Sequence, residues 1–149
     1  MSCVFGFDVG SRFTGVAIGN TYTASARALA TLAVRDSGPD WPHLDALHQQ
    51  WQPDTLVVGL PLALDGAEQP ASRRARRFAA QLQQRYDLPV VLVDERHSSQ
   101  EAAQRFAAGR AAGLRRRRDA ADIDAEAAAV ILERWLAGAG TPAAGQSGP

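Results

Sequence analysis

The sequence predicts one α/β domain in which a mixed five-stranded sheet carries helices on both faces. Three observations support this prediction. The first third of the chain contains three strand-like segments joined by short turns, which is typical of an antiparallel meander. The remainder alternates amphipathic helices with short apolar strands, which is typical of parallel strands joined by helices. At 149 residues, 46% of them hydrophobic, the chain is large enough to bury one core.

The meander is predicted from segments near the N-terminus. Residues 3–9 form a buried apolar strand, a turn over 11–13 follows, and residues 14–19 return as the second strand. Residues 23–34 supply the third strand. The next segment, "DSGPDWP" (36–42), is rich in turn-forming residues and is predicted to be a loop.

Two helices and two strands are predicted after the meander. A strand is expected at "DTLVVGLP" (54–61), and residues 71–86 repeat apolar side chains at helical spacing. The segment "LPVVLVDE" (88–95) has the apolar continuity of a strand buried on both faces. The helix before these elements places its apolar and aromatic side chains on one stripe, at Trp41, Leu44, Leu47, His48 and Trp51.

The C-terminal third combines a capping motif, a basic segment and a helix. The pattern Ser-x-x-Glu at 98–101 is a capping box that opens a short helix ending near Gly109. The arginine-rich segment after it is predicted to be a mobile connection, and the last helix covers 124–137. We assign 1–137 to the folded domain and 138–149, which has no apolar pattern, to a disordered tail.

The charged residues are balanced in number but uneven in distribution. Sixteen arginines and sixteen acidic residues give a formal net charge of zero, and the chain has no lysine. Arginines cluster in two runs, one in the second helix and one before the last helix. The planar guanidinium matches the geometry of phosphate, whereas a solvated helix face and a mobile loop explain the runs equally well. The candidate nucleic-acid-binding residues are Arg12, Arg73, Arg77, Arg115, Arg116, Arg117 and Arg118.

Composition also predicts the cellular environment. The single cysteine, Cys3, excludes an internal disulfide and fits a reducing compartment. No apolar run approaches the roughly 20 residues of a membrane span, and the N-terminus lacks the pattern of a secretory signal. We therefore expect a cytoplasmic protein that does not bind a membrane.

Asp8 raises the first functional question, because a carboxylate near the end of a buried strand needs a partner. Strand alternation places Asp8 on one face with Val4, Gly6 and Gly10. These neighbours are small, so we expect space for an ion or a ligand beside the carboxylate.

Two further carboxylates are predicted to face the protein interior. Glu95 ends its strand on the face of Val91 and Val93, whereas Asp94 points the opposite way. In the last helix Asp124 shares a stripe with Ala128, Ile131 and Trp135, while Asp122 lies in line with Glu126, Ala129 and Glu133 on a more polar side. Asp122 is therefore expected to be a solvent-facing N-cap or first-turn acid.

Three inward carboxylates from separate elements repel one another unless a cation lies between them. Hard oxygen ligands suit Mg²⁺ or Mn²⁺, and no cysteine or histidine set has the spacing of a zinc site. Such clusters hold two ions about 4 Å apart in enzymes that cleave phosphodiesters. The pattern therefore predicts Asp8, Glu95 and Asp124 as a catalytic metal site.

Four segments resemble the four sequence blocks of the YqgF family, also called RuvX. They are "FGFDVGSRFTGVAIG", "VVGLPLALDGAEQP", "VDERHSSQEA" and "IDAEAAAVILERWL", and they occur in family order. The resemblance implies an RNase H-like fold related to the Holliday-junction resolvase RuvC. It implies nuclease chemistry, with maturation of the 5′ end of small-subunit ribosomal RNA as the assigned role. Asp8, Glu95 and Asp124 match the acidic positions of the family.

The chain departs from the family pattern at two places. His97, Ser98 and Ser99 stand where the family often has leucine and threonines, and we expect the serines to retain the capping hydroxyl and His97 to lie at the surface. RuvC-like enzymes carry two acids on the last helix, but the spacing of Asp122 and Asp124 does not place both on one helix face.

Several functions remain open at this point. The leading hypothesis is a metal-dependent endonuclease acting on structured RNA, with precursor ribosomal RNA and ribosomal assembly particles as partners. Cleavage of Holliday junctions, and hence of branched DNA, is the alternative within the same chemistry; it requires a symmetric dimer, whereas we expect a monomer or a weak homodimer. A non-catalytic nucleic-acid-binding factor in transcription or ribosome assembly is a second class. An actin-like or kinase-like ATPase is a third, suggested only by "DVGSRFTG".

Overall fold

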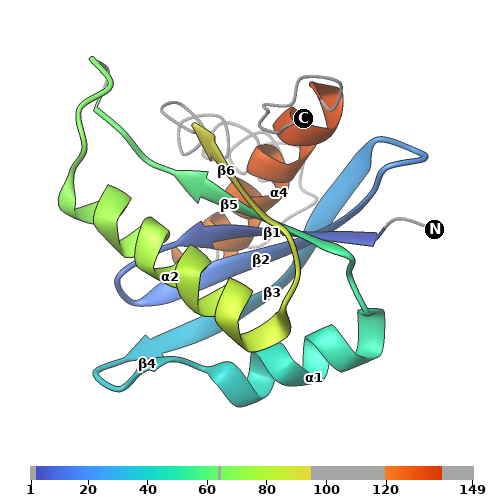
Figure 1. Ribbon diagram of the computed structural model, residues 1–149, viewed down its shortest axis with the longest axis horizontal. Helices are drawn as coiled ribbons and strands as arrows, with labels where there is room; N and C mark the ends of the chain where they lie inside the picture. The colour runs from blue at the N-terminus through green and yellow to red at the C-terminus, as the bar shows by residue number, and fades with distance from the viewer. Residues whose placement is uncertain (1–2, 64, 95–119, 139–149) are drawn as a thin grey trace, which may run out of the picture.

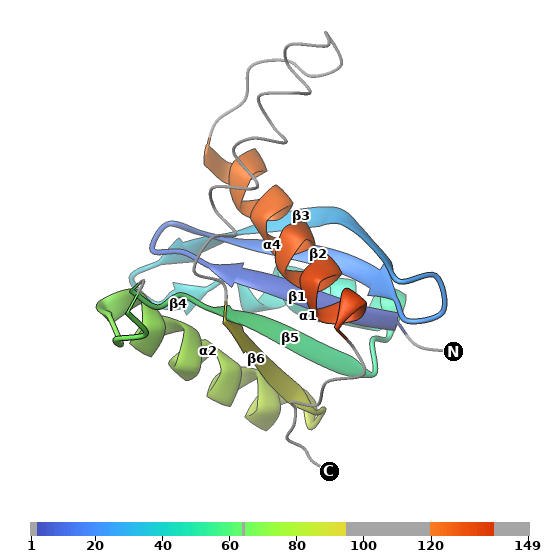
Figure 2. The same ribbon diagram turned by 90° about the horizontal axis from the view of Figure 1, so that it is seen from above.

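The computed structural model describes residues 3–63, 65–94 and 120–138, with side chains in the last range from residue 125 onward. A six-stranded sheet forms the centre of the fold, in the order β4-β3-β2-β1-β5-β6. Helices α1 and α2 cover one face, and α4 covers the other (Figures 1 and 2). The elements are β1 (Cys3–Val9), β2 (Phe13–Asn20), β3 (Ser25–Arg35), β4 (Gly38–Pro39), α1 (Trp41–Trp51), β5 (Thr55–Leu60), α2 (Pro70–Tyr86), β6 (Val90–Asp94) and α4 (Ala120–Ala137).

The sheet is mixed, as the sequence predicts. β1 pairs with β2 and β2 with β3 in antiparallel register, whereas β1 pairs with β5 and β5 with β6 in parallel register. The three parallel strands therefore end at the same edge of the sheet (Figure 1). The predicted meander and the predicted helices on both faces are confirmed.

The strand count differs from the prediction because β4 lies in a segment predicted to be a loop. β4 pairs with the end of β3, Val34 opposite Pro39 and Arg35 opposite Gly38. Gly38 adopts a φ of +116°, which a residue with a side chain rarely adopts. Residues 36–37 turn the chain, and Gly38 directly after them begins β4 opposite Arg35, so the composition that indicates a loop also allows a tight hairpin.

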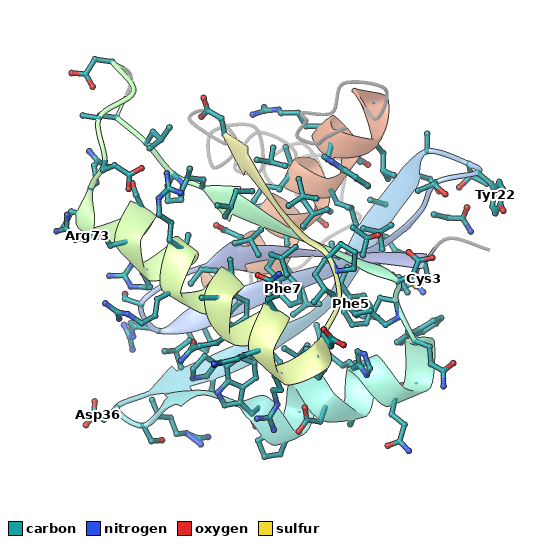
Figure 3. The ribbon with its side chains drawn as sticks, in the orientation of Figure 1. Cys3, Phe5, Phe7, Tyr22, Asp36 and Arg73 are labelled. Atoms are coloured by element: carbon teal, nitrogen blue, oxygen red, sulfur yellow. The ribbon has the colours of Figure 1, made fainter. Side chains whose placement is uncertain are left out.

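The core on the α1 and α2 side is aromatic. Phe5 and Phe7 of β1 are fully buried (Figure 3). Phe7 contacts Phe78 of α2 with ring centroids 5.3 Å apart. Trp41 at the start of α1 stacks on Phe78 at 5.6 Å. Of the predicted α1 stripe, Leu44 is fully buried and the other apolar members pack against this core in part.

An ion pair at the surface joins α1 to α2. Arg85 lies 2.6 Å from the Asp45 carboxylate, and Tyr86 donates a hydrogen bond to the same carboxylate at 2.6 Å. The hydrogen bond from Arg85 holds the pKa of Asp45 at about 2. His48, the histidine of the predicted stripe, stacks on Tyr86 at 4.4 Å and is thereby part of this helix–helix contact.

The core on the α4 side is built from small and branched aliphatic residues. Val4 and Val57 of the sheet pack against Ala128, Ile131 and Leu132, all nearly or fully buried. Val4 and Phe5 therefore face opposite sides of the sheet, as the alternation in β1 predicts.

The expectation that the last sheet strand is buried on both faces is wrong. Among the described strands β6 lies at the end of the strand order, with Leu92 37% exposed. Val91 and Val93 pack against the α4-side core, and Val90 packs against the opposite core. The apolar side chains of β6 therefore point to both faces of the sheet. They are less buried than those of a central strand because only β5 pairs with β6 among the described strands. Within the described ranges no helix has the length and apolar character needed to cross a membrane.

Candidate active site

Asp8 lies at the carboxyl end of β1, on the sheet face that α4 covers. Val4 belongs to the α4-side core and Gly6 contacts α4 directly, so strand alternation assigns the same face to Asp8. Asp8 is half-buried and is paired across the sheet with Gly15 of β2. Its position on this face is the one that the sequence predicts.

The glycines near Asp8 serve close backbone packing. A Cβ on Gly6 would lie 2.9 Å from Leu132 Cβ and 3.2 Å from the Ala128 carbonyl oxygen. A Cβ on Gly10 would lie 2.4 Å from the Phe13 carbonyl oxygen, which accepts a hydrogen bond from the Gly10 N–H. At Gly6 the small residue makes room for α4, whereas the expected space beside the Asp8 carboxylate stays a prediction.

Substitution of Gly6 by alanine tests this packing. We expect Gly6→Ala to lower the free energy of unfolding by about 1–3 kcal/mol, the usual cost of overpacking a filled core. Urea denaturation followed by circular dichroism measures the change. An unfolding free energy equal to that of the parent would show that α4 moves away from β1 without cost.

The contacts of α4 define its direction along the sheet. Leu132 and Leu136 approach Gly19, which pairs with Val4 near the start of β1, whereas Ala128 and Leu132 approach Gly6. The helix therefore runs towards the start of β1, and its N-terminal end lies at the same end of the sheet as the carboxyl end of β1 (Figures 1 and 2).

Helix geometry places residue 124 of α4 at the level of Asp8. The four residues from 128 back to 124 span about 6 Å along a helix. The two residues from Gly6 to Asp8 span about 6.6 Å along a strand. Because Ala128 contacts Gly6 and α4 runs towards the start of β1, position 124 lies towards the end of the sheet at which β1 carries Asp8.

The phase predicted for the last helix is confirmed in part. Ala128 and Ile131 are fully buried, and Trp135 packs against the same cluster. Ala129, which we assigned to the polar side, is buried as well, because alanine allows close contact on that flank. The helix also begins at Ala120 rather than 124, so residue 122 lies in its first turn. The Asp122 and Asp124 side chains lie outside the described residues.

Glu95 lies outside the described residues, directly after the last residue of β6. The neighbouring positions support the predicted parity, since Val91 and Val93 contact the α4-side core. β5 separates β1 from β6, so two strand spacings of about 4.8 Å lie between them. The predicted helix over 98–109, His97 and the tail from 139 onward also lie outside the described residues.

The donor set near Asp8 suits a hard cation as far as the structure describes it. The described residues contain no group of three histidine, cysteine, aspartate or glutamate side chains that could hold a metal ion. Two members of the predicted triad, Glu95 and Asp124, fall outside that search. The Asp8 carboxylate has oxygen atoms of the kind that hard cations prefer; α4 packs on its face of the sheet, and Val91 and Val93 of β6 belong to the same core.

The described arginines differ in what they contact. Arg12 is exposed in the turn between β1 and β2, and Arg73 and Arg77 are exposed on α2. Arg76 of α2 is paired with Glu68 at 2.6 Å, and its hydrogen bond lowers the pKa of that carboxyl. Residues 115–118 lie outside the described part of the chain. Sequence reasoning did not single out Arg74, which lines a surface pocket together with Arg77.

The mixed sheet in this strand order, with helices on both faces, defines an α/β fold of the RNase H-like, RuvC-like kind. Thermus thermophilus RuvC in complex with a Holliday junction substrate aligns over 95% of this chain and 98% of its own, with a TM-score of 0.55 and 16% identity. The fowlpox virus Holliday junction resolvase aligns over 92% and 99%, with a TM-score of 0.55 and 11% identity. These similarities concern the fold.

The sequence comparisons give the family. A family model described as "RuvX: Holliday junction resolvase" matches residues 2–138, and the chain belongs to this family. A protein of Xanthomonas axonopodis pv. citri (strain 306), named "Putative pre-16S rRNA nuclease", is 63% identical over 134 residues, which cover 90% of this chain and 86% of that protein. A relative of the same name from Xanthomonas campestris pv. campestris (strain 8004) is 61% identical over 133 residues, covering 89% and 86%.

Proposed function

We propose that this protein is a metal-dependent endonuclease that cleaves phosphodiester bonds in structured RNA and matures the 5′ end of precursor 16S ribosomal RNA. Membership of the RuvX family and 63% identity to a relative named for that substrate support the proposal. The structural observation that carries it is the position of Asp8, at the end of β1 opposite the N-terminal turns of α4.

The proposed catalytic and metal-binding residues are Asp8, Glu95 and Asp124. Their carboxylate oxygens suit Mg²⁺ or Mn²⁺, with two ions in the site. Such ions activate water and stabilise the leaving oxygen of a phosphodiester. Asp8, Glu95 and Asp124 would hold these ions, and α4 covers the sheet face on which Asp8 lies.

The length of the Glu95 side chain fits its proposed role. Strand alternation after Val91 and Val93 predicts that Glu95 faces α4, on the same side as Asp8. Glu95 follows a strand that is two positions from β1 in the sheet. Glutamate has one methylene more than aspartate, and we expect this longer side chain to favour a metal ion shared with Asp8.

Cationic residues complete the proposed substrate site. Three metal-binding carboxylates repel the phosphate backbone, so nearby arginines offset that repulsion. Arg12 lies in the turn that directly follows Asp8 on β1, and residues 115–118 precede α4 in sequence. Arg73 and Arg77 extend the contact along α2. We propose that the protein acts in the cytoplasm, as a monomer or a weak homodimer.

Holliday-junction cleavage is the second candidate, favoured by the description of the family model and by the RuvC-like fold. Purified protein incubated with precursor ribosomal RNA and with a four-way DNA junction, each with Mn²⁺ and with EDTA, separates the two. We expect Mn²⁺-dependent cleavage of the RNA. Cleavage confined to the junction would favour the resolvase, and binding without cleavage of either substrate would favour a non-catalytic factor.

A further inference from the structure

A surface pocket lies on the sheet face opposite Asp8, between the two β-hairpins and α2. Its volume is about 230 Å³, several times the roughly 30 Å³ that one water molecule occupies in the liquid. The β1–β2 hairpin contributes Thr14, the β3–β4 hairpin contributes Arg35 and Asp36, and α2 contributes Arg74 and Arg77. Asp36, on the hairpin, and Arg73, beside Arg74 at the start of α2, lie at the same end of the molecule (Figure 3).

The pocket has a net positive charge, and two of its arginines form no ion pair with the described residues. Three arginines and one aspartate line it, a formal surplus of two positive charges. Among the described residues, Arg76 forms an ion pair with Glu68 and Arg85 with Asp45, each at 2.6 Å, whereas Arg74 and Arg77 form no ion pair. Two guanidinium groups on consecutive turns of one helix can therefore bind an anion.

Thr14 gives an independent indication of a ligand. Its side chain is fully buried in the pocket wall, and its Oγ1 has no hydrogen-bond partner among the described residues. A buried hydroxyl without a partner costs about 1–3 kcal/mol. Oγ1 is closed to a water molecule, so an oxygen-rich group in the pocket supplies the missing acceptor when the Thr14 side chain turns outward on binding.

The residues that line the pocket favour a phosphate group over a base. Phe78 is the aromatic residue of its lining, and that ring is 2% exposed and already packed against Phe7 and Trp41. No other aromatic residue is found in the described lining for a base to stack on. Arginine pairs, in contrast, match the geometry of phosphate oxygens.

The position of the pocket relates it to the candidate active site. Thr14 pairs with Val9, and the adjacent pair on the same two strands is Gly15 with Asp8. The two sites are therefore neighbours along β1 and lie on opposite faces of the sheet. Arg12 is exposed in the turn that joins β1 to β2, at the end of these strands and therefore between the two faces of the sheet.

We propose that this pocket binds one backbone phosphate of the nucleic-acid substrate, which passes round the end of β1 from the Asp8 face to the Arg74 face. This inference rests on the proposed function, because it assigns a second contact to the same substrate. Arg74 and Arg77 bind the phosphate oxygens, and Thr14 donates its hydroxyl to the bound group or to its water.

Binding measured without metal tests the pocket separately from cleavage. The probe is a fluorescein-labelled single-stranded RNA carrying the precursor 16S cleavage region, titrated in EDTA at several salt concentrations. We expect the double variant Arg74→Ala/Arg77→Ala to bind several-fold more weakly, with a salt slope smaller by about 0.7, the value for one phosphate of a single strand. Thr14→Val should weaken binding and retain the melting temperature.

Arg76→Ala is the matched control, because Arg76 lies on the same helix and is paired with Glu68. We expect its affinity and salt slope to equal those of the parent. Equal losses in the control and in the double variant would overturn the proposal, as would a parent protein that does not bind the RNA. Calorimetric titration with orthophosphate tests whether the pocket binds free phosphate instead of RNA. The proposal is wrong if orthophosphate binds the parent protein while the double variant keeps the full affinity for RNA.

Cleavage by the same variants separates this inference from the proposed function. With Mn²⁺ and saturating RNA, the double variant should retain the kcat of the parent and show a raised KM. If the parent cleaves no RNA, the proposed nuclease function fails, whereas a binding difference between the double variant and Arg76→Ala would still support the pocket.

Discussion

Asp124→Asn is expected to abolish cleavage of precursor ribosomal RNA and to leave the fold intact. Position 124 lies one helical turn before Ala128, which contacts Gly6, and we propose that its carboxylate is a metal ligand together with Asp8. Loss of an acidic ligand weakens metal binding and the positioning of the scissile phosphate. The initial rate of RNA cleavage in Mn²⁺ measures the effect, and the melting temperature measures the fold.

Asp122→Asn is the matched control for that substitution. Residue 122 lies in the first turn of α4, two positions from 124 and therefore on a different helix face. We expect it to retain most of the activity and to lose only the small contribution of an acid near a helix N-terminus, about 0.3–1 kcal/mol of stability. Activity abolished by Asp122→Asn and retained by Asp124→Asn would show that our assignment of the helix faces is wrong.

Replacement of Arg115, Arg116, Arg117 and Arg118 by alanine is expected to produce the largest loss of RNA affinity. These four residues are a quarter of the sixteen arginines in the chain, and they precede in sequence the helix that contains Asp124. Each lost phosphate contact on a duplex removes about 0.9 from the salt slope. Fluorescence anisotropy with a labelled precursor RNA hairpin, titrated at several salt concentrations, measures both quantities.

The metal site provides the control for the four-arginine variant. Its carboxylates are unchanged, so Mn²⁺ binding measured by calorimetry should match that of the parent. An RNA affinity and a salt slope equal to those of the parent would show that the run is a solvated segment without a role in binding.

Local periodicity was sufficient to predict most of the sheet and helices. The alternation in β1 places Phe5 and Phe7 in one core and Val4 in the other, and this follows from the geometry of any strand. β4 was missed because its pairing depends on a single backbone conformation, the φ of +116° at Gly38. Composition does not distinguish such a hairpin from a loop.

The edge position of β6 was missed for a different reason. An apolar run shows that side chains on both faces are apolar, but it contains no information on whether a further strand pairs alongside. Val90, Val91 and Val93 do contact the two cores, while Leu92 is partly exposed. Strand order is a property of the tertiary fold, and no local pattern determines it.

In the candidate site, too, features that depend on one element were predicted, and features that depend on several elements were missed. Strand alternation and helix phase point to Asp8 and to position 124, because each depends on one element only. The pocket of Arg74, Arg77 and Thr14 combines three elements and needs the pairing of β3 with β4 to form its wall. Sequence reasoning instead joined Arg73 to Arg77, since four-residue spacing is the stronger local signal on a helix.

The central claim is that Asp8, Glu95 and Asp124 form one metal site. A crystal soaked in Mn²⁺, with data collected at a wavelength that gives an anomalous signal from manganese, tests it most directly. We predict an anomalous peak bridging the carboxylates of Asp8 and Glu95, with Asp124 close enough to coordinate. Anomalous peaks confined to other residues, with these three carboxylates dispersed in the metal-bound crystal, would contradict the account.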